Sequence, residues 1–167
     1  HADAVIADAY MKGIRNFDVN LAYEAIRKDA MVPPDCDTNR KYGDRDYWTS
    51  YEGRAGASYY HSIGYVPDDK TAESVSRTLE YAYDDWCVAQ MAKSLGKMED
   101  YAHLMRFSGN YKNLSNPEKG FFLPRNYDGT WIDLDDNSRH GLTEGSKWTY
   151  LFCVLQDIPG MIDLMGG

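Results

Sequence analysis

The sequence lacks any apolar run long enough to cross a membrane, which requires about 20 consecutive apolar residues. It is also short of basic residues, with 18 Lys and Arg against 26 Asp and Glu and a formal charge of −8. Because binding to a phosphate backbone needs clustered Lys and Arg, this balance argues against a nucleic-acid partner. The same charge disfavours docking on an anionic membrane surface.

Cysteine and histidine are scarce. The three cysteines, Cys36, Cys87 and Cys153, cannot all pair internally, and none has a spacing typical of a zinc site. Cys87 and Cys153 fall within apolar helical patterns and are predicted to be buried thiols. The four histidines show no paired metal-ligand spacing, and no Gly-rich phosphate loop or Ser-His-Asp frame is present. Nucleotide-binding folds and serine-hydrolase triads are therefore disfavoured.

Strand alternation is missing, whereas helical periodicity recurs along the chain. Asp18 and Thr71 are predicted helix N-caps, and Gly96 is a predicted helix stop. The chain is therefore predicted to be all-α, with helices paired antiparallel and one long polar excursion. Helices are expected over residues 1–14, 18–30, 47–63, 72–95, 98–114 and 143–156, and the excursion over residues 115–142.

Aromatic residues are plentiful, with 14 Tyr and 4 Trp. Aromatic rings can stack on sugar faces and carboxylates can bind sugar hydroxyls, so this composition suits a carbohydrate pocket. A tyrosine-rich core would give the same composition, so this alternative stays open.

Five blocks of sequence, in order along the chain, resemble the catalytic domain of the glycoside hydrolase family 92 α-mannosidases. Such enzymes are calcium-dependent exo-α-mannosidases that invert anomeric configuration, and they join a β-sandwich to an (α/α)6 toroid. The resemblance implies that residues 1–167 form a single segment of that toroid within a longer polypeptide. The blocks are HADAVIADAYMKG at 1–13, SVSRTLEYAYDDW at 74–86, NYKN at 110–113 with GFFLPR at 120–125, EGSKWTY at 144–150 and DIPGMIDLMGG at 157–167.

The resemblance also implies partners and a location. The substrate would be a mannose-containing glycan, the enzyme would be secreted or periplasmic, and calcium would be held mainly by residues beyond Gly167. The general base would also lie outside the chain, so the segment alone would need the remainder of the same polypeptide for activity. The alternative is a non-catalytic helical module that binds carbohydrate or another protein.

Glu144 matches the position of the family's general acid. Inverting hydrolysis needs a protonated carboxylic acid at the leaving oxygen and a carboxylate that activates water across the sugar ring. Trp148, one helical turn further on, is a predicted substrate-binding residue that could also give the acid apolar cover. Two alternatives remain: Glu144 could be an acidic residue in a helical first turn, or position 12 of a calcium loop that begins at Asp133. Ser138 replaces the Gly that such a loop requires.

Three further residues are predicted to contact substrate. Adjacent residues of a helix point about 100° apart, so at most one of Asp84 and Asp85, taken to be Asp85, would touch a sugar. Both could instead be solvated or structural. Trp86 could be a sugar platform, although its apolar helix face also fits core packing. Arg54, which lies between Gly53 and Gly56 in a loop similar to one of the family, could contact hydroxyls or occupy a surface turn.

The block at 144–150 also departs from the commoner family pattern. Ser146, Thr149 and Gln156 stand where Asn, Gln and His are expected. These differences leave the reaction type unaffected but put the preferred linkage in doubt, so α-1,2-mannose is not assumed as the substrate.

Overall fold

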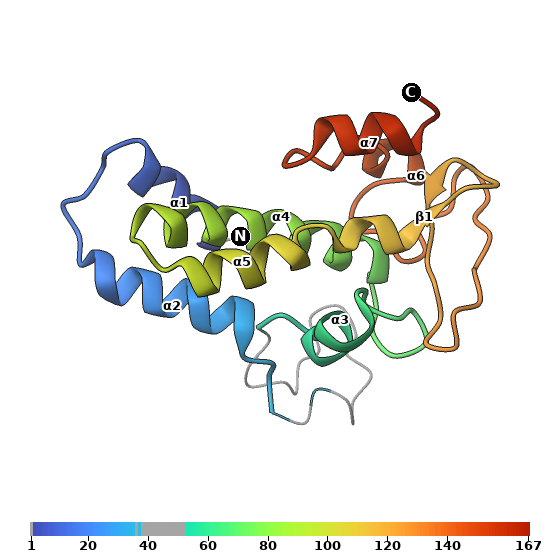
Figure 1. The fold of residues 1–167 in the computed structure, drawn as a ribbon. Coiled ribbons are helices and arrows are strands. Elements are labelled where there is room, and N and C mark those ends of the chain that lie inside the picture. Colours follow the sequence, from blue (N-terminus) through green and yellow to red (C-terminus); the bar gives the residue numbers. More distant parts are fainter. Residues whose placement is uncertain (1, 36, 38–52) are drawn as a thin grey trace.

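The computed structural model describes residues 2–35, 37 and 53–167, and most of them form helices (Figure 1). Two short strands, β1 (Ser115–Asn116) and β2 (Phe121–Phe122), pair antiparallel as a hairpin. The prediction of an all-α chain is therefore confirmed, with this hairpin as a small addition inside the polar excursion.

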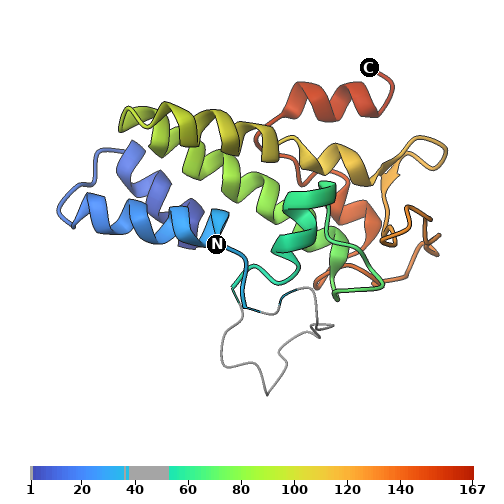
Figure 2. The same ribbon diagram turned by 60° about the horizontal axis from the view of Figure 1, so that its bottom comes forward.

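Helix α4 (Ser74–Ser94) is the centre of the fold. Helices α1 (Ala2–Met11), α2 (Val19–Met31) and α5 (Met98–Phe107) all contact it. In both views of the ribbon these three helices lie beside the C-terminal half of α4 (Figures 1 and 2). Because α4 is covered on several sides, its apolar residues are not confined to one stripe.

The remaining elements gather near the N-terminal half of α4. They are α3 (Ala57–Ile63), the 3₁₀ helix η2 (Asn110–Leu114), α6 (Lys147–Tyr150) and α7 (Ile158–Leu164). Helix α6 contacts β2, and η2 contacts α4. Figure 1 shows α6 and α7 on the opposite side of the molecule from α3.

The core divides along α4 into two large clusters and a small one made of Tyr60, Val66 and Tyr81. Val75 and Leu79 belong to the first, which joins η2, β2 and the excursion, whereas Val88 and Met91 belong to the second, which joins α1, α2 and α5. Cys87 is buried in the second cluster, as predicted. Cys153 is only partly buried, against the first cluster, and Cys36 lies outside the described residues.

Helix ends are partly as predicted. Asp18 caps α2 by accepting a 3.0 Å hydrogen bond from the backbone N–H of Leu21, and Gly96 follows α4 with a left-handed φ of 74°. The prediction of Thr71 as a cap is wrong, because α4 begins after Glu73, which makes no side-chain cap. The backbone N–H groups of Val75 and Ser76 instead donate to the carbonyl of Gly141, at 2.9 and 3.2 Å.

Three predicted helices are shorter than expected. In residues 143–156 only α6 is helical, and it begins after Glu144, whose left-handed φ of 53° a helix cannot accommodate. The helix predicted over 98–114 changes to η2 after a break at Ser108 and Gly109. The helix predicted over 47–63 begins at Ala57, and residues 47–52 lie outside the described part.

An apolar groove of about 300 Å³ runs between α1, α4 and the segment after α6. Val5, Phe152 and Leu155 are 68%, 61% and 65% exposed along it. If the segment belongs to a larger toroid, as the resemblance predicts, further helices would cover these side chains. The groove is lined by Ala4, Val5, Leu79, Glu80, Tyr83, Phe152, Cys153 and Leu155.

We expect residues 1–167 expressed alone to self-associate through this groove, as measured by size-exclusion chromatography with light scattering. Replacing Val5, Phe152 and Leu155 by Ser should reduce the association, because it removes exposed apolar area. The control Leu21→Ser changes a residue that is 64% exposed on α2, away from the groove, and should not reduce it. A monodisperse wild-type monomer would show that the groove needs no cover.

Candidate functional site

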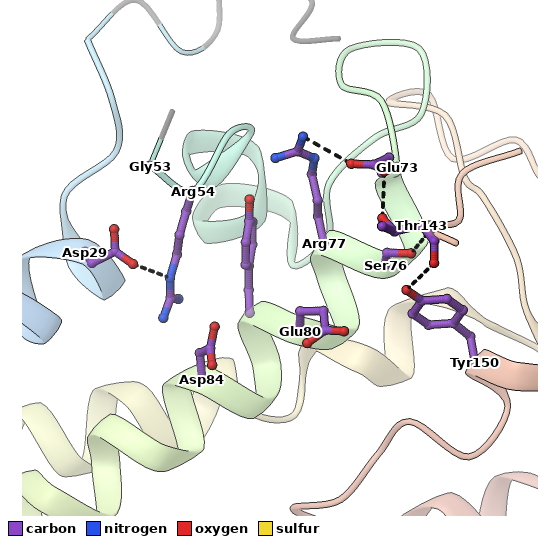
Figure 3. A pocket seen from close by; sticks show the side chains of 11 residues that line it. Asp29, Gly53, Arg54, Glu73, Ser76, Arg77, Glu80, Asp84, Thr143 and Tyr150 are labelled. Carbon is purple, nitrogen blue, oxygen red and sulfur yellow. Dashed lines mark hydrogen bonds and ion pairs between the residues drawn. The ribbon is translucent and has the colours of Figure 1, made fainter. Parts of the chain in front are cut away.

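A charged cleft of about 360 Å³ opens over the N-terminal half of α4 (Figure 3). Its volume falls within the range of small-molecule sites, roughly 300–1,000 Å³. Four carboxyl groups and two guanidinium groups converge on it, which suits a ligand with many hydroxyl groups. The cleft is lined by Asp29, Gly53, Arg54, Glu73, Ser76, Arg77, Glu80, Tyr81, Asp84, Thr143 and Tyr150.

Helix α4 supplies the floor of the cleft. Ser76, Glu80 and Asp84 are four residues apart, so they form one row along the helix. Glu73 and Arg77 begin a neighbouring row and form an ion pair with an N···O distance of 3.4 Å. Figure 3 shows Glu80 between the Arg54 side and the Tyr150 side of the cleft.

Burial perturbs the two acidic groups on the floor. It raises the pKa of the Glu80 carboxyl above its ordinary value, and the nearby negative charge of Asp84 raises it further. Burial likewise raises the pKa of Asp84, which is 4% exposed. Both groups therefore keep a proton to higher pH than surface carboxyls do, a property common at functional sites.

Arg54 closes one end of the cleft from a buried position. Its guanidinium donates to Asp3 of α1 at 2.8 Å and to Asp85 of α4, and it lies 3.4 Å from the carboxylate of Asp29 of α2. Burial alone would lower the pKa of Arg54, but Asp85 and Asp3 outweigh it and raise that pKa. The surface-turn alternative for Arg54 is wrong, because the side chain is 4% exposed and joins three helices.

Asp85 lies beneath the cleft rather than on its surface. It is fully buried, and its oxygens accept hydrogen bonds from Arg54 and from the hydroxyl of Tyr60, the latter at 2.9 Å. Burial raises its pKa to about 6, against the lowering effect of Arg54. The structure thus brings Asp85 to Arg54, while its neighbour Asp84 faces the cleft. Direct sugar contact by Asp85 stays a prediction.

Glu144 follows Thr143, one of the cleft-lining residues at the other end. Its side chain is exposed, and its backbone φ of 53° costs a non-glycine residue about 1–2 kcal/mol. Such strain persists only where the surroundings enforce it, and it is concentrated at functional sites. The alternative of Glu144 as a first-turn helix residue is wrong, because α6 starts only at Lys147.

Trp148 does not lie one helical turn from Glu144, since that part of the chain is not helical. Its ring, 54% exposed, packs edge-on against Phe121 with 4.7 Å between the centroids. Trp86 lies at the other end of α4, partly buried and stacked on Tyr83 at 6.4 Å. Neither tryptophan lines the charged cleft, so their substrate contacts stay predictions.

The residues described here do not fit a calcium site. No group of three or more His, Cys, Asp or Glu that could hold a metal ion occurs among residues 2–35, 37 and 53–167. In the loop that could mimic a calcium-binding loop, Asp133 pairs with Lys119 at 2.7 Å and Asp136 with Lys147 at 2.8 Å. Calcium therefore enters no step derived from these residues.

No helix of the described part is long and apolar enough to span a membrane.

Sequence reasoning missed much of the cleft. Glu80 and Arg77 were hidden among the apolar residues of α4, Asp29 lies near the end of α2, and Tyr150 lies on a short helix. One available signal was the row of polar residues four apart on a helix that is otherwise largely buried. The approach of Asp29 and Tyr150 depends on tertiary contacts that no local pattern encodes.

Comparison with known proteins assigns the chain to a family. A sequence profile of the glycosyl hydrolase family 92 catalytic domain matches residues 1–167, the whole chain. The chain belongs to glycoside hydrolase family 92. Its helices therefore form part of a helical toroid, as the resemblance implied.

The similar proteins of the family are much longer than this family 92 segment. The chain is 37% identical to a protein of Arthroderma benhamiae named an uncharacterized secreted glycosidase, and it covers 24% of that protein. It superimposes on an inverting family 92 mannosidase of Bacteroides thetaiotaomicron with a TM-score of 0.85 and 36% identity, covering 99% of this chain and 21% of that one.

A second solved structure, a family 92 α-mannosidase of Bacteroides thetaiotaomicron, gives a TM-score of 0.82 at 37% identity. That match covers 99% of this chain and 20% of the other. An α-mannosidase from the same organism in complex with mannoimidazole gives 0.80 at 35% identity, over 99% of this chain and 21% of the other. The segment thus spans about a fifth to a quarter of these relatives.

The buried position of Arg54 makes a stability prediction for the full-length polypeptide. Arg54→Met leaves Asp3 and Asp85 buried without their shared guanidinium, so the free energy of unfolding should fall by about 3–5 kcal/mol. The matched control, Arg27→Met, removes a half-exposed partner of Asp100 and should cost at most about 1 kcal/mol. Urea unfolding measures both, and equal losses would contradict the buried network.

Proposed function

We propose that this chain supplies one wall of the active site of an inverting α-mannosidase, with Glu144 as the general acid. The observation that carries the proposal is the position of a strained Glu144 directly after Thr143, which lines a cleft rich in carboxyl groups, in a family that includes solved mannosidases. The substrate would be a mannose-containing glycan, as the mannoimidazole complex of one relative supports.

The cleft fits this role chemically. Carboxylates accept hydrogen bonds from sugar hydroxyls, and guanidinium groups donate to sugar oxygens. Glu80 and Asp84 would serve as acceptors on the floor, and Arg77 would serve as a donor at the side. Arg54 would act from beneath, by holding the Asp85 carboxylate of α4 in place.

Glu144 would protonate the glycosidic oxygen as the bond to the anomeric carbon breaks. A water molecule, deprotonated by a base on the opposite face of the sugar, would attack that carbon and invert its configuration. A general acid must keep its proton at the working pH, which requires apolar or negatively charged surroundings. Since Glu144 is exposed here, we propose that residues outside the segment complete its cover and supply the base and calcium.

One relative supports a location for the complete enzyme. The Arthroderma benhamiae protein is named a secreted glycosidase, so we propose that the complete enzyme is secreted or periplasmic. The segment alone is expected to be inactive, because the base would be missing.

Substrates with different leaving groups test the role of Glu144 in the full-length polypeptide. A natural mannoside leaves as an alkoxide and needs the proton, whereas an activated aryl mannoside leaves as a phenolate and needs it much less. Glu144→Gln should therefore slow a natural disaccharide by roughly 10²–10⁴-fold and the aryl substrate far less. The alkaline limb of the pH–rate profile should also disappear.

Glu118→Gln is the matched control, because it changes another exposed glutamate in a loop. It should leave both rates unchanged. Equal losses on the two substrates with Glu144→Gln, partly restored by added calcium, would assign Glu144 to a metal instead. Lost stability with unchanged turnover would assign it a structural role, and a wild-type polypeptide without mannosidase activity would favour a binding module.

A further inference from the structure

The residue before Glu144 has all of its polar groups engaged. The backbone N–H of Thr143 donates to Oγ of Ser76 at 2.7 Å, and its Oγ1 donates to Oε1 of Glu73 at 2.8 Å. Its carbonyl accepts a 2.9 Å hydrogen bond from the hydroxyl of Tyr150. Figure 3 shows these three partners gathered around Thr143. A residue held at three points has little freedom to rotate.

The partners themselves are fixed. Ser76 and Glu73 belong to the first turn and N-cap of α4, the most buried helix of the described part. Tyr150 is 7% exposed in the first core cluster, and burial raises the pKa of its hydroxyl, which stays protonated as a donor. The three hydrogen bonds to Thr143 therefore fix the loop that carries Glu144 relative to α4 and the first core cluster.

The chain just after Glu144 is also confined. A Cβ atom on Gly145 would lie 3.0 Å from Cε2 of Tyr150, so the backbone of Gly145 runs close against that ring. Glu144 thus stands between a residue held by three hydrogen bonds and a residue packed on Tyr150. This confinement explains how a non-glycine residue keeps a φ of 53° in an otherwise exposed loop.

We infer that Tyr150, Thr143 and Ser76 are positioning residues that hold Glu144 in the orientation it needs to donate a proton. This inference rests on the proposed acid role of Glu144. None of the three needs to touch the reacting atoms, because each acts on Glu144 through the backbone of Thr143. We call the three hydrogen bonds to Thr143 the Thr143 clasp. A small displacement of a catalytic group can cost on the order of 10²-fold in rate, so loss of the clasp should slow the reaction.

Tyr150→Phe in the full-length polypeptide tests the clasp. It deletes the hydroxyl that holds the Thr143 carbonyl and keeps the ring that packs on Gly145. We expect kcat on a natural disaccharide to fall about 10- to 100-fold and kcat on an activated aryl mannoside to fall less than about threefold. KM should hardly change, and the alkaline limb of the pH–rate profile should weaken.

Tyr65→Phe is the matched control. Tyr65 is also a buried tyrosine of the first core cluster, 5% exposed, and its hydroxyl donates to a backbone carbonyl, that of Asn126, at 2.8 Å. It lies outside the cleft lining. This substitution should leave the ratio of the two rates unchanged, even if it lowers the melting temperature as much as Tyr150→Phe does.

The Thr143 side chain provides a second, independent test. Thr143→Val removes the hydroxyl bonded to Glu73 while keeping the shape, and should shift the rate ratio in the same direction. Thr143→Ser restores the hydroxyl and should return the ratio to the wild-type value. An unchanged ratio in both Thr143→Val and Tyr150→Phe would overturn the inference.

Glu144→Gln, measured alongside, distinguishes a failure of the positioning role from a failure of the acid role. If it discriminates between the substrates and the Tyr150 and Thr143 variants do not, only the positioning inference fails. If Glu144→Gln itself lowers both rates equally, the proposed acid role fails. A rise in KM on both substrates with Tyr150→Phe would make Tyr150 a direct sugar contact and would also overturn the positioning role.

Discussion

The buried guanidinium of Arg54 is the interaction on which the arrangement of the helices depends. It binds carboxylates of α1 and α4 and lies beside one of α2, so three helices that are separate in the sequence converge on one group. Arginine suits this position because its planar fork offers several donors in fixed directions and keeps its charge when buried. More carboxylates than cations surround it, which leaves the neighbouring cleft with an acidic character.

The cleft has an Arg54 end and a Thr143 end, and α4 connects them. At the Arg54 end, ion pairs hold the helices together from below. At the Thr143 end, a loop is tied to the first turn of the same helix and puts Glu144 in a conformation it would otherwise avoid. The α4 row that includes Glu80 and Asp84 lies between these ends. A ligand in the cleft would therefore meet groups whose relative positions are set by a single helix.

How much the sequence could predict depended on the range of the interactions involved. The helix cap at Asp18 and the helix stop at Gly96 depend on neighbouring residues only, so the sequence predicted both. Helix α4 was visible as well, but its N-terminus was misplaced. The groups that satisfy its first turn come from Gly141, more than sixty residues later in the chain. Glu144 was found through family resemblance, whereas its left-handed backbone could not be anticipated, because glutamate carries no preference for that conformation.

The later part of the long excursion, between Arg125 and Gly141, is held at both ends by backbone hydrogen bonds. The carbonyl of Arg125 accepts from Asp68, and the carbonyl of Gly141 accepts from the first turn of α4. A loop that is fixed at two points can change length between them at little entropic cost. The alignment with the Arthroderma benhamiae protein extends over 203 positions for the 167 residues of this chain, so length variation has occurred within the segment. A segment held at two points in this way can change in sequence and length without shifting α4 or the cleft over it.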